Sequence, residues 1–363
     1  MNDTLLIRAD ASVRMGTGHV MRCLGLAQAW QDEGGRVVYA MAAASPGMEE
    51  RLRAEEIEVR RLAVEPGSAE DALATIETAK TEGIAWIVVD GYHFDEPFQR
   101  TVKQAEQRLL AVDDFGKLPH YWADIVLNQD PIAEESLYGN REPYTRLLLG
   151  TEYTFLRREF RARPSARRQT PPVARKLLVT MGGSDPDNVT EKVIRSLDSV
   201  AVDGLEAIVL VGPSNPHGPR LEVAARECRA RIQLLRNPPN IPELMAECDM
   251  AVTAGGSTIW ELAYFGMPCI VLTLAENQEP VAQLLHRRGA CLGLGPDARK
   301  AAADLAATIS ALCHDPTARA ALGAKLGAAI DGRGAERVCA AMCGNGHEGL
   351  PPTGLCEPAR GRA

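Results

Sequence analysis

Two kinds of hydrophobic pattern alternate along the first half of the chain. Short apolar runs bounded by charged residues are typical of buried parallel strands, whereas apolar residues that recur every three or four positions are typical of amphipathic helices. Helical patterns cover 69–81 and 97–107. The predicted strands are 5–7, 37–41, 86–90, 109–113, 125–128 and 146–149. This alternation predicts an α/β domain with a doubly wound parallel sheet.

A basic, proline-rich stretch at 157–175, RREFRARPSARRQTPPVAR, interrupts the pattern, and its composition predicts a linker. The alternation then restarts, with strands predicted at 176–181, 207–211, 232–235, 250–253 and 269–274 and helices at 189–197, 241–247, 258–265 and 280–288. We therefore expect two Rossmann-like domains, 1–163 and 164–343, that face each other across a cleft lined by the carboxyl ends of both sheets. Residues 344–363 are rich in Gly and Pro and are expected to form a disordered tail.

The first predicted strand leads into a glycine-rich turn, MGTGHVMRCLGLAQAW at 15–30. Beyond His19 the apolar residues recur at helical spacing until a Gly-Gly pair ends the pattern. Gly16 and Gly18 allow positive φ or the close approach of a ligand. His19 is expected at the start of the helix and at the carboxyl end of the strand, where open α/β sheets bind ligands. The alternative is that His19 only caps the helix and that the glycines only shape the turn.

A second glycine-rich turn lies within MAVTAGGSTIWELAYFGMPCIVLTLAENQ, at 250–278. The backbone amides at a helix start after Gly256 suit a diphosphate, and Ser257 can either add a hydroxyl donor or cap the helix. Glu261, one turn later on the same face, can accept both ribose hydroxyls or be a solvated surface charge. The next loop offers two amide side chains that suit sugar hydroxyls and acetamido groups, Asn277 and Gln278.

The composition limits the class of protein without naming a function. With 363 residues, 45% of them hydrophobic, the chain is long enough for two globular cores. Its pI near 5.5 argues against non-specific binding of nucleic acid. The sequence has no apolar run of membrane-spanning length and no signal peptide before the first strand. Nine cysteines, scattered through apolar runs, indicate reduced and buried thiols. These features predict a cytoplasmic protein, expected to be a monomer, without membrane or nucleic-acid partners.

Six motifs follow one another in a recognisable order. They are RADAS (8–12), GTGHVMRCL (16–24), VDDFG (112–116), LNQD (127–130), TMGGSDPDN (180–188) and the block 254–278. The last block resembles the C-terminal half of GT-B nucleotide-sugar enzymes, especially the transferase that adds N-acetylglucosamine to the peptidoglycan lipid precursor. Over roughly residues 4–340, the six motifs together resemble the UDP-2,4-diacetamido-2,4,6-trideoxy-β-L-altropyranose hydrolases of pseudaminic acid synthesis. Related polysaccharide-pathway proteins share most of these motifs.

This resemblance implies a GT-B fold and an inverting cleavage of the anomeric C–O bond that releases UDP from a UDP-linked diacetamido-trideoxyhexose. It implies that His19, in the GxGHxxR motif, is the base that activates water, and the helix dipole favours a neutral ring there. It also implies no cofactor, no metal, and a role in supplying a nonulosonic acid for surface polysaccharide or flagellin glycosylation. The residues expected to contact substrate are Gly16, Gly18, Arg22, Asp90, Tyr92, Gly183, Ser184, Ile241 (beside the uracil ring), Gly256, Ser257, Glu261, Asn277 and Gln278.

The residue that orients the His19 ring stays open at this point. The candidates are Asp10, Arg14 and Arg22. Further polar residues follow strand ends at the same edge and could touch the sugar, although acidic ones often cap the next helix. These are Asp90, Tyr92, His93, Asp113 and Asp114.

Two further alternatives concern the second half of the chain and the reaction. The segment 185–187 spells the DxD pattern that binds a metal in other nucleotide-sugar enzymes, but its place before a helix favours capping. The rival functions are a GT-B glycosyltransferase, a hydrolysing 2-epimerase on the same fold, and a non-enzymatic protein that binds a UDP-sugar.

Overall fold

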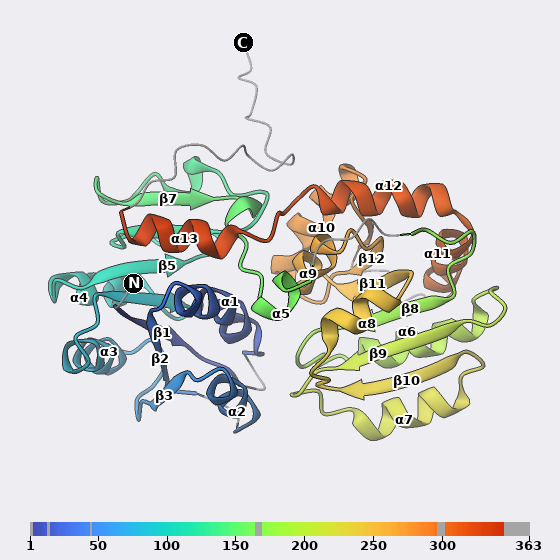
Figure 1. Cartoon of the computed structure of the whole chain (residues 1–363), viewed down its shortest axis with the longest axis horizontal. Helices are drawn as coiled ribbons and strands as arrows, with labels where there is room; N and C mark the ends of the chain where they lie inside the picture. Colours follow the sequence, from blue (N-terminus) through green and yellow to red (C-terminus); the bar gives the residue numbers. More distant parts are fainter. Residues whose placement is uncertain (1–2, 13–14, 44–45, 164–168, 296–301, 345–363) are drawn as a thin grey trace, which may run out of the picture. The chain divides into compact units, whose positions relative to one another are not determined.

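The computed structural model describes residues 3–12, 15–43, 46–163, 169–295 and 302–344. The chain divides into two compact units. The N-terminal unit comprises Met1–Arg158 with Gly332–Ala363, and the C-terminal unit comprises Glu159–Asp331. Each unit is a parallel sheet with helices packed on its faces (Figure 1).

The N-terminal unit is built on a seven-stranded sheet in the order β3-β2-β1-β4-β5-β6-β7. Its strands are β1 (Thr4–Ala9), β2 (Arg36–Met41), β3 (Glu58–Arg61), β4 (Trp86–Asp90), β5 (Arg108–Val112), β6 (Ile125–Asn128) and β7 (Arg146–Leu149). All neighbouring pairs are parallel. The strand order reverses between β1 and β4, which makes that position the switch point of the sheet.

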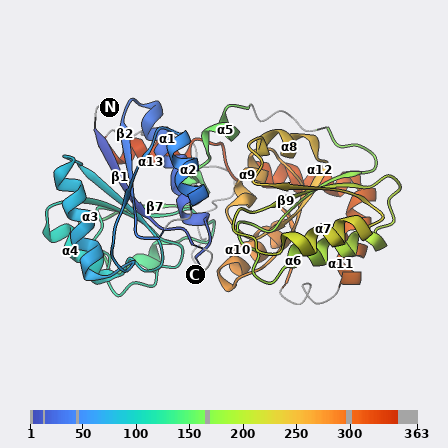
Figure 2. The ribbon, with the colours of Figure 1, turned by 90° about the horizontal axis from the view of Figure 1, so that it is seen from below.

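Helices cover both faces of this sheet because its central strands are apolar on both sides. The helices are α1 (Gly18–Asp32), α2 (Pro46–Ala54), α3 (Ala69–Thr81), α4 (Glu96–Gln104) and α13 (Gly334–Met342), with short 3₁₀ turns η1 (Glu135–Tyr138) and η2 (Thr151–Tyr153). Leu5 and Ile7 of β1 pack in one core with α1, α2 and α13, whereas Leu6 packs in the opposite core with α3 and α4. Figure 2 shows these two groups of helices on opposite sides of the strands.

The C-terminal unit repeats the plan with six parallel strands in the order β10-β9-β8-β11-β12-β13. The strands are β8 (Lys176–Thr180), β9 (Glu206–Val211), β10 (Arg231–Arg236), β11 (Met250–Ala254), β12 (Cys269–Leu272) and β13 (Leu292–Leu294). The helices are α5 (Arg158–Arg161), α6 (Val189–Ser196), α7 (Gly218–Glu227), α8 (Ile241–Glu247), α9 (Thr258–Tyr264), α10 (Glu279–Arg287), α11 (Ala302–His314) and α12 (Pro316–Gly327), with 3₁₀ turns η3 (Leu197–Ser199) and η4 (Glu276–Gln278). Here the switch point lies between β8 and β11.

The predicted doubly wound α/β architecture is confirmed, but the predicted domain boundaries differ from the division that the structure shows. Residues 334–342 were predicted to belong to the second domain, whereas α13 packs against α1 through Ala335, Val338 and Cys339. The indole Nε1 of Trp86 also donates to the Met342 carbonyl at 3.1 Å. The last helix therefore completes the core of the N-terminal unit. The predicted linker contains the short helix α5, and the predicted tail lies, apart from Gly344, outside the described residues.

Two predictions from composition can be compared with the described residues. None of the described helices combines the length and the apolar character that crossing a membrane would require. Cys23, Cys269 and Cys291 are buried free thiols, as predicted. Burial raises the pKa of the Cys269 thiol well above its ordinary value, so this sulfur stays protonated and behaves as a small apolar group.

Candidate active site

The switch point of the N-terminal sheet brings two loops together. The loop after β1 leads into α1, and the loop after β4 leaves the sheet beside it, because Ala9 at the end of β1 pairs with Asp90 at the end of β4. α1 begins at Gly18, so His19 occupies its first turn, as predicted. Residues 71 positions apart in the sequence therefore meet at the carboxyl edge of the sheet, where doubly wound proteins bind ligands.

His19 is held by a buried carboxylate. Its Nδ1 lies 2.7 Å from Oδ1 of Asp90, and the two side chains are 14% and 1% exposed. An ionised carboxylate only accepts hydrogen bonds, so Nδ1 carries the ring proton and Nε2 keeps its lone pair. A histidine in this tautomer can take a proton at Nε2, and the carboxylate then stabilises the imidazolium that forms.

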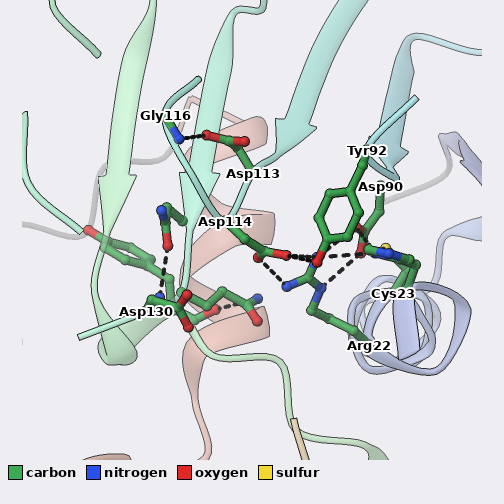
Figure 3. Close-up of polar contacts among 12 residues, drawn as sticks. Arg22, Cys23, Asp90, Tyr92, Asp113, Asp114, Gly116 and Asp130 are labelled. Carbon is green, nitrogen blue, oxygen red and sulfur yellow. Dashed lines mark hydrogen bonds and ion pairs between the residues drawn. The ribbon is translucent and has the colours of Figure 1, made fainter. Parts of the chain in front are cut away.

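Arg22, one helical turn after His19, fixes the carboxylate in turn. Its Nε and Nη2 donate to the two oxygens of Asp90 at 2.9 and 2.7 Å, and the Cys23 thiol lies 3.3 Å from the same group (Figure 3). Nη2 also lies 3.5 Å from His19 Nδ1, but it already donates to Asp90 at the shorter distance. Burial acts to raise the pKa of Asp90, yet the charge of Arg22 and the contacts with His19 hold it well below its ordinary value. Asp90 is therefore ionised at neutral pH.

The same guanidinium reaches a second carboxylate, in the loop after β5. Arg22 Nη1 donates to Asp114 Oδ1 at 2.6 Å, and the Tyr92 hydroxyl donates to Asp114 Oδ2 at 3.0 Å (Figure 3). The Tyr92 ring meets the His19 ring edge to face, with centroids 4.8 Å apart, and Tyr92 is 59% exposed. His19, Asp90, Arg22, Asp114 and Tyr92 thus form one connected group, which we term the His19 cluster.

This geometry answers the open question of what orients His19. Arg22 and Asp90 bind each other, because a buried carboxylate and a guanidinium each satisfy the other's charge, and their contact with substrate stays a prediction. Asp90 orients the ring directly and Arg22 does so through Asp90. Asp10 belongs to a different contact network, and Arg14 lies outside the described residues.

The two glycines before His19 differ in what they do for the turn. Gly16 has φ of 76° and pairs with Ser12 in an isolated antiparallel bridge, a conformation that favours glycine. A Cβ built at Gly18 would meet no heavy atom within 4 Å, so the space beside it is open. That Gly16, Gly18 and Tyr92 contact substrate stays a prediction.

One acidic residue near the His19 cluster was not predicted to have a role. Asp130 follows β6, the neighbour of β5, and its backbone N–H is held by the Asn128 side chain at 2.9 Å. Burial, followed by the charge of Asp114, raises the pKa of Asp130 to about 7. Asp113, by contrast, accepts from the Tyr121 hydroxyl and the Gly116 N–H, so it shapes the loop after β5. The motifs 112–116 and 127–130 end at neighbouring strands, β5 and β6, and this adjacency could have indicated that Asp130 lies near Asp114.

A pH-dependent stability effect is expected from Asp130. Its pKa in the folded protein lies above the ordinary 3.8, so between about pH 4 and 7 the native state holds a proton that the unfolded chain releases. The contribution of Asp130 to stability therefore falls as the pH rises through this window. Asp130→Asn removes the charge, so the Tm difference between variant and parent should be more positive at pH 8 than at pH 5. Thermal unfolding followed by circular dichroism measures these Tm values. Equal Tm differences at pH 5 and pH 8 would mean that the pKa of Asp130 is not raised in the folded protein.

In the C-terminal unit, two loops meet at the carboxyl edge as the sequence predicts. The turn Gly255–Gly256–Ser257 leads from β11 into α9, and the loop after β12 places Gln278 against it. Gln278 Oε1 accepts from the Leu274 N–H at 2.8 Å, and a Cβ at Gly255 would lie 2.8 Å from Gln278 Cβ. Ser257 is exposed, and its side chain makes no capping hydrogen bond, so the capping alternative for this residue does not hold.

The remaining predicted nucleotide contacts lie on neighbouring elements of the same unit. Glu261 is half-buried on α9, one turn after Ser257, and Asn277 is exposed in η4. Ile241 is the half-buried first residue of α8, the helix that precedes β11. Their contacts with a nucleotide stay predictions.

The segment 182–188 after β8 divides into a turn and a cap. Gly183 accepts from the Ser214 N–H through its carbonyl at 3.1 Å, which joins the turn to the loop after β9. Asp185 is 2% exposed, and its two oxygens accept from the N–H groups of Val189 and Thr190, each at 2.8 Å. The predicted capping of α6 by this segment is therefore confirmed for Asp185. These two amides of α6 are therefore not available to a diphosphate, and contacts of Gly183 and Ser184 with substrate stay predictions.

No group of three or more His, Cys, Asp or Glu side chains that could hold a metal ion occurs within the part of the chain that the structure describes.

Comparison with known proteins relates the chain to enzymes that act on nucleotide sugars. Residues 177–337 match the glycosyltransferase family 28 C-terminal domain. The UDP-2,4-diacetamido-2,4,6-trideoxy-beta-L-altropyranose hydrolase of Campylobacter jejuni is 24% identical over 287 residues, which cover 78% of this chain and 97% of the relative. This match confirms the resemblance found in the six motifs.

A second relative and a solved structure widen the comparison. Uncharacterized protein MJ1062 of Methanocaldococcus jannaschii is 26% identical over 280 residues, 76% of this chain but only 56% of the relative's own length. The structure of Anabaena Alr3699/HepE in complex with UDP-glucose superposes with a TM-score of 0.62 at 16% identity, covering 94% of this chain and 99% of that one. The chain therefore has the GT-B fold, as predicted.

Proposed function

We propose that this protein hydrolyses a UDP-sugar at the anomeric carbon and that the sugar is 2,4-diacetamido-2,4,6-trideoxy-β-L-altropyranose. The observation that carries the proposal is the His19–Asp90 contact of 2.7 Å at the switch point of the N-terminal sheet. The choice of sugar rests on the six motifs and on the Campylobacter jejuni relative.

The proposed step needs one base and one good leaving group. Water attacks the anomeric carbon, a new C–O bond forms, and the bond from that carbon to the phosphate oxygen breaks with its electron pair going to UDP. The water proton goes to Nε2 of His19, while Asp90 stabilises the resulting imidazolium. UDP leaves as an anion that needs little protonation, so general acid catalysis is less necessary than in ordinary glycoside hydrolysis. Attack from the face opposite to UDP inverts the anomeric carbon.

The nucleotide is assigned to the C-terminal unit. Most of the residues that match the glycosyltransferase family 28 domain lie there, and the Gly255–Gly256–Ser257 turn, which packs against Gln278, carries the exposed residue Ser257. Backbone N–H groups in such turns bind diphosphates, and Glu261 on α9 can accept the ribose hydroxyls.

A glycosyltransferase is the second candidate. The matched domain is that of a glycosyltransferase family, and the Anabaena protein of the same fold was solved in complex with UDP-glucose. Release of UDP without any acceptor separates the two functions. A panel of UDP-linked 6-deoxy-diacetamido sugars should include one that the protein turns over in buffer alone, with UDP measured by chromatography. Slow release that accelerates only when a sugar or lipid-linked acceptor is added would favour the transferase.

Glu261 provides a test of the nucleotide assignment. Glu261→Ala should weaken UDP binding by about 10- to 100-fold, equivalent to roughly 1.5 to 3 kcal/mol for hydrogen bonds to a charged group. Isothermal titration calorimetry with UDP measures this directly. Glu243→Ala on α8 is a matched control, since Glu243 pairs with Arg163 at the surface. Unchanged UDP affinity in Glu261→Ala would remove this residue from the site.

A further inference from the structure

A second carboxylate at the same sheet edge, Asp10, lies outside the His19 cluster. Asp10 follows β1 directly, and its side chain is fully buried. Its Oδ1 accepts from the backbone N–H groups of Ala42 and Ala43, each at 2.8 Å. The Ala11 N–H donates to the Ala43 carbonyl at 2.9 Å. Asp10 thereby ties the start of the loop that carries His19 to the loop after β2.

The other oxygen of Asp10 faces two nitrogen-bearing side chains from different elements. Oδ2 lies 2.8 Å from Nη1 of Arg8 and 3.2 Å from Nε2 of His93. Neither Oδ2 nor Nε2 has a well-aligned hydrogen-bond partner among the described residues, so their contact is one of close approach rather than of a directed hydrogen bond. His93 follows Tyr92 in the loop after β4, so the same carboxylate also touches the loop that carries Tyr92.

The His93 residue packs closely against glycine backbone, at positions where a Cβ would not fit. A Cβ at Gly91 would lie 2.7 Å from His93 Cε1, and a Cβ at Gly67 would overlap the His93 carbonyl. The His93 ring packs on Phe94 with centroids 4.1 Å apart. His93 is therefore packed within the loop that carries Tyr92, between the backbone at Gly91 and the Phe94 ring.

Arg8, the cationic partner of Asp10, is held in place by a second carboxylate. It is fully buried in β1, and its Nε and Nη2 donate to the two oxygens of Asp71 on α3 at 2.8 and 2.7 Å. Asp71 also accepts from Thr75 and from the Gly67 N–H, but it makes no hydrogen bond or ion pair with the described residues 10–12, 15–18 and 91–93. Arg8 thus has two carboxylate partners, of which Asp10 alone touches both loops of the site.

We propose that Asp10 is a positioning residue for catalysis: it holds the loop that carries His19 and the loop that carries Tyr92 in one fixed arrangement across the switch point. The proposal rests on the proposed function for its kinetic readout. Asp10 itself contacts no substrate, because its side chain is buried and its two oxygens face protein groups.

The decisive comparison is Asp10→Asn against Asp71→Asn. Each variant removes one buried carboxylate charge from Arg8, so both should lower Tm. Only Asp10→Asn should also lower kcat, by about 10-fold or more, with the Kd for UDP unchanged within about twofold. Asp71→Asn should keep kcat within about threefold of the parent. All rates are measured well below both Tm values.

A second readout does not depend on turnover. The Nδ1 proton of His19, hydrogen-bonded to Asp90, should give a downfield proton NMR signal that Asp10→Asn shifts or broadens and Asp71→Asn leaves in place. If no UDP-sugar is hydrolysed by the parent protein, the proposed function fails, but this signal still tests the positioning role.

Several outcomes would overturn the proposal. Equal kcat losses in Asp10→Asn and Asp71→Asn would mean that the charge network supports folding only. A raised KM with unchanged kcat would place Asp10 in substrate binding instead. If Asp10→Asn does not fold, His93→Gln tests the proposal instead. This variant removes the contact of Asp10 with the loop after β4 and leaves its contacts with the loop after β2. It should lower kcat about three- to tenfold with little change in Tm, and an unchanged kcat would contradict the proposal.

Discussion

Replacement of His19 by Ala should lower kcat for hydrolysis of the UDP-sugar by about 10²-fold or more, the usual range for loss of a general base. Nε2 of this ring holds the lone pair that takes the proton from water, because Asp90 fixes the proton on Nδ1. The affinity for UDP should not change, since the groups assigned to the nucleotide belong to the C-terminal unit. Steady-state rates and calorimetric titration with UDP measure the two quantities.

His19→Asn is the informative companion. Asn keeps a polar side chain that can cap α1 but offers no base, so the variant should be nearly as inactive as His19→Ala. Near parental turnover in His19→Asn would mean that His19 only shapes the turn. The base would then have to be another residue, and Asp130, with a pKa of about 7, would be the first to test.

Asp90→Asn should lower kcat by about 10² to 10⁴-fold, by comparison with the carboxylate-to-amide change in serine protease triads. An amide cannot accept from Arg22 and from His19 on both sides, because one of its two terminal atoms is a donor. The ring then loses its fixed tautomer and its partner for the imidazolium. KM should change little, since the Asp90 side chain is only 1% exposed.

Asp124→Asn is the matched control for that variant. Asp124 pairs with Lys103 at 2.6 Å and accepts from the Leu109 N–H at 2.7 Å, but it lies at the amino end of β6, away from the His19 cluster. Its loss should affect Tm and leave kcat unchanged. If Asp124→Asn and Asp90→Asn reduced kcat equally, the effect would be one of general stability rather than of His19 orientation.

Elements with strong patterns were predictable from sequence, and for some of them both ends were predicted as well. The predictions for 69–81, 146–149 and 241–247 match α3, β7 and α8 at both ends. The strand β3 was missed because EVRR carries three charged residues, which a strand at the edge of a sheet tolerates. The place of α13 depends on contacts with α1, far earlier in the sequence, and no local pattern carries that information.

The candidate site shows the same division between local and long-range information. The glycine-rich turn and the helix start located His19, because both are local features. The identity of its partner depends on the pairing of Ala9 with Asp90 and on the side-chain directions at two strand ends. For the same reason, the contact between Arg22 and Asp90 was not predicted from the sequence. Asp130 needed the neighbouring position of β5 and β6 to be noticed.

The central claim is that water attacks the anomeric carbon, and hydrolysis in ¹⁸O-labelled water tests it most directly. The UDP-linked diacetamido sugar is incubated with the protein in this solvent, without an acceptor, and the products are separated for mass spectrometry. We predict one ¹⁸O atom on C1 of the free sugar and none in UDP, because the bond from C1 to the phosphate oxygen is the one that breaks. Label in the phosphate of UDP, or no turnover without an acceptor, would contradict this account.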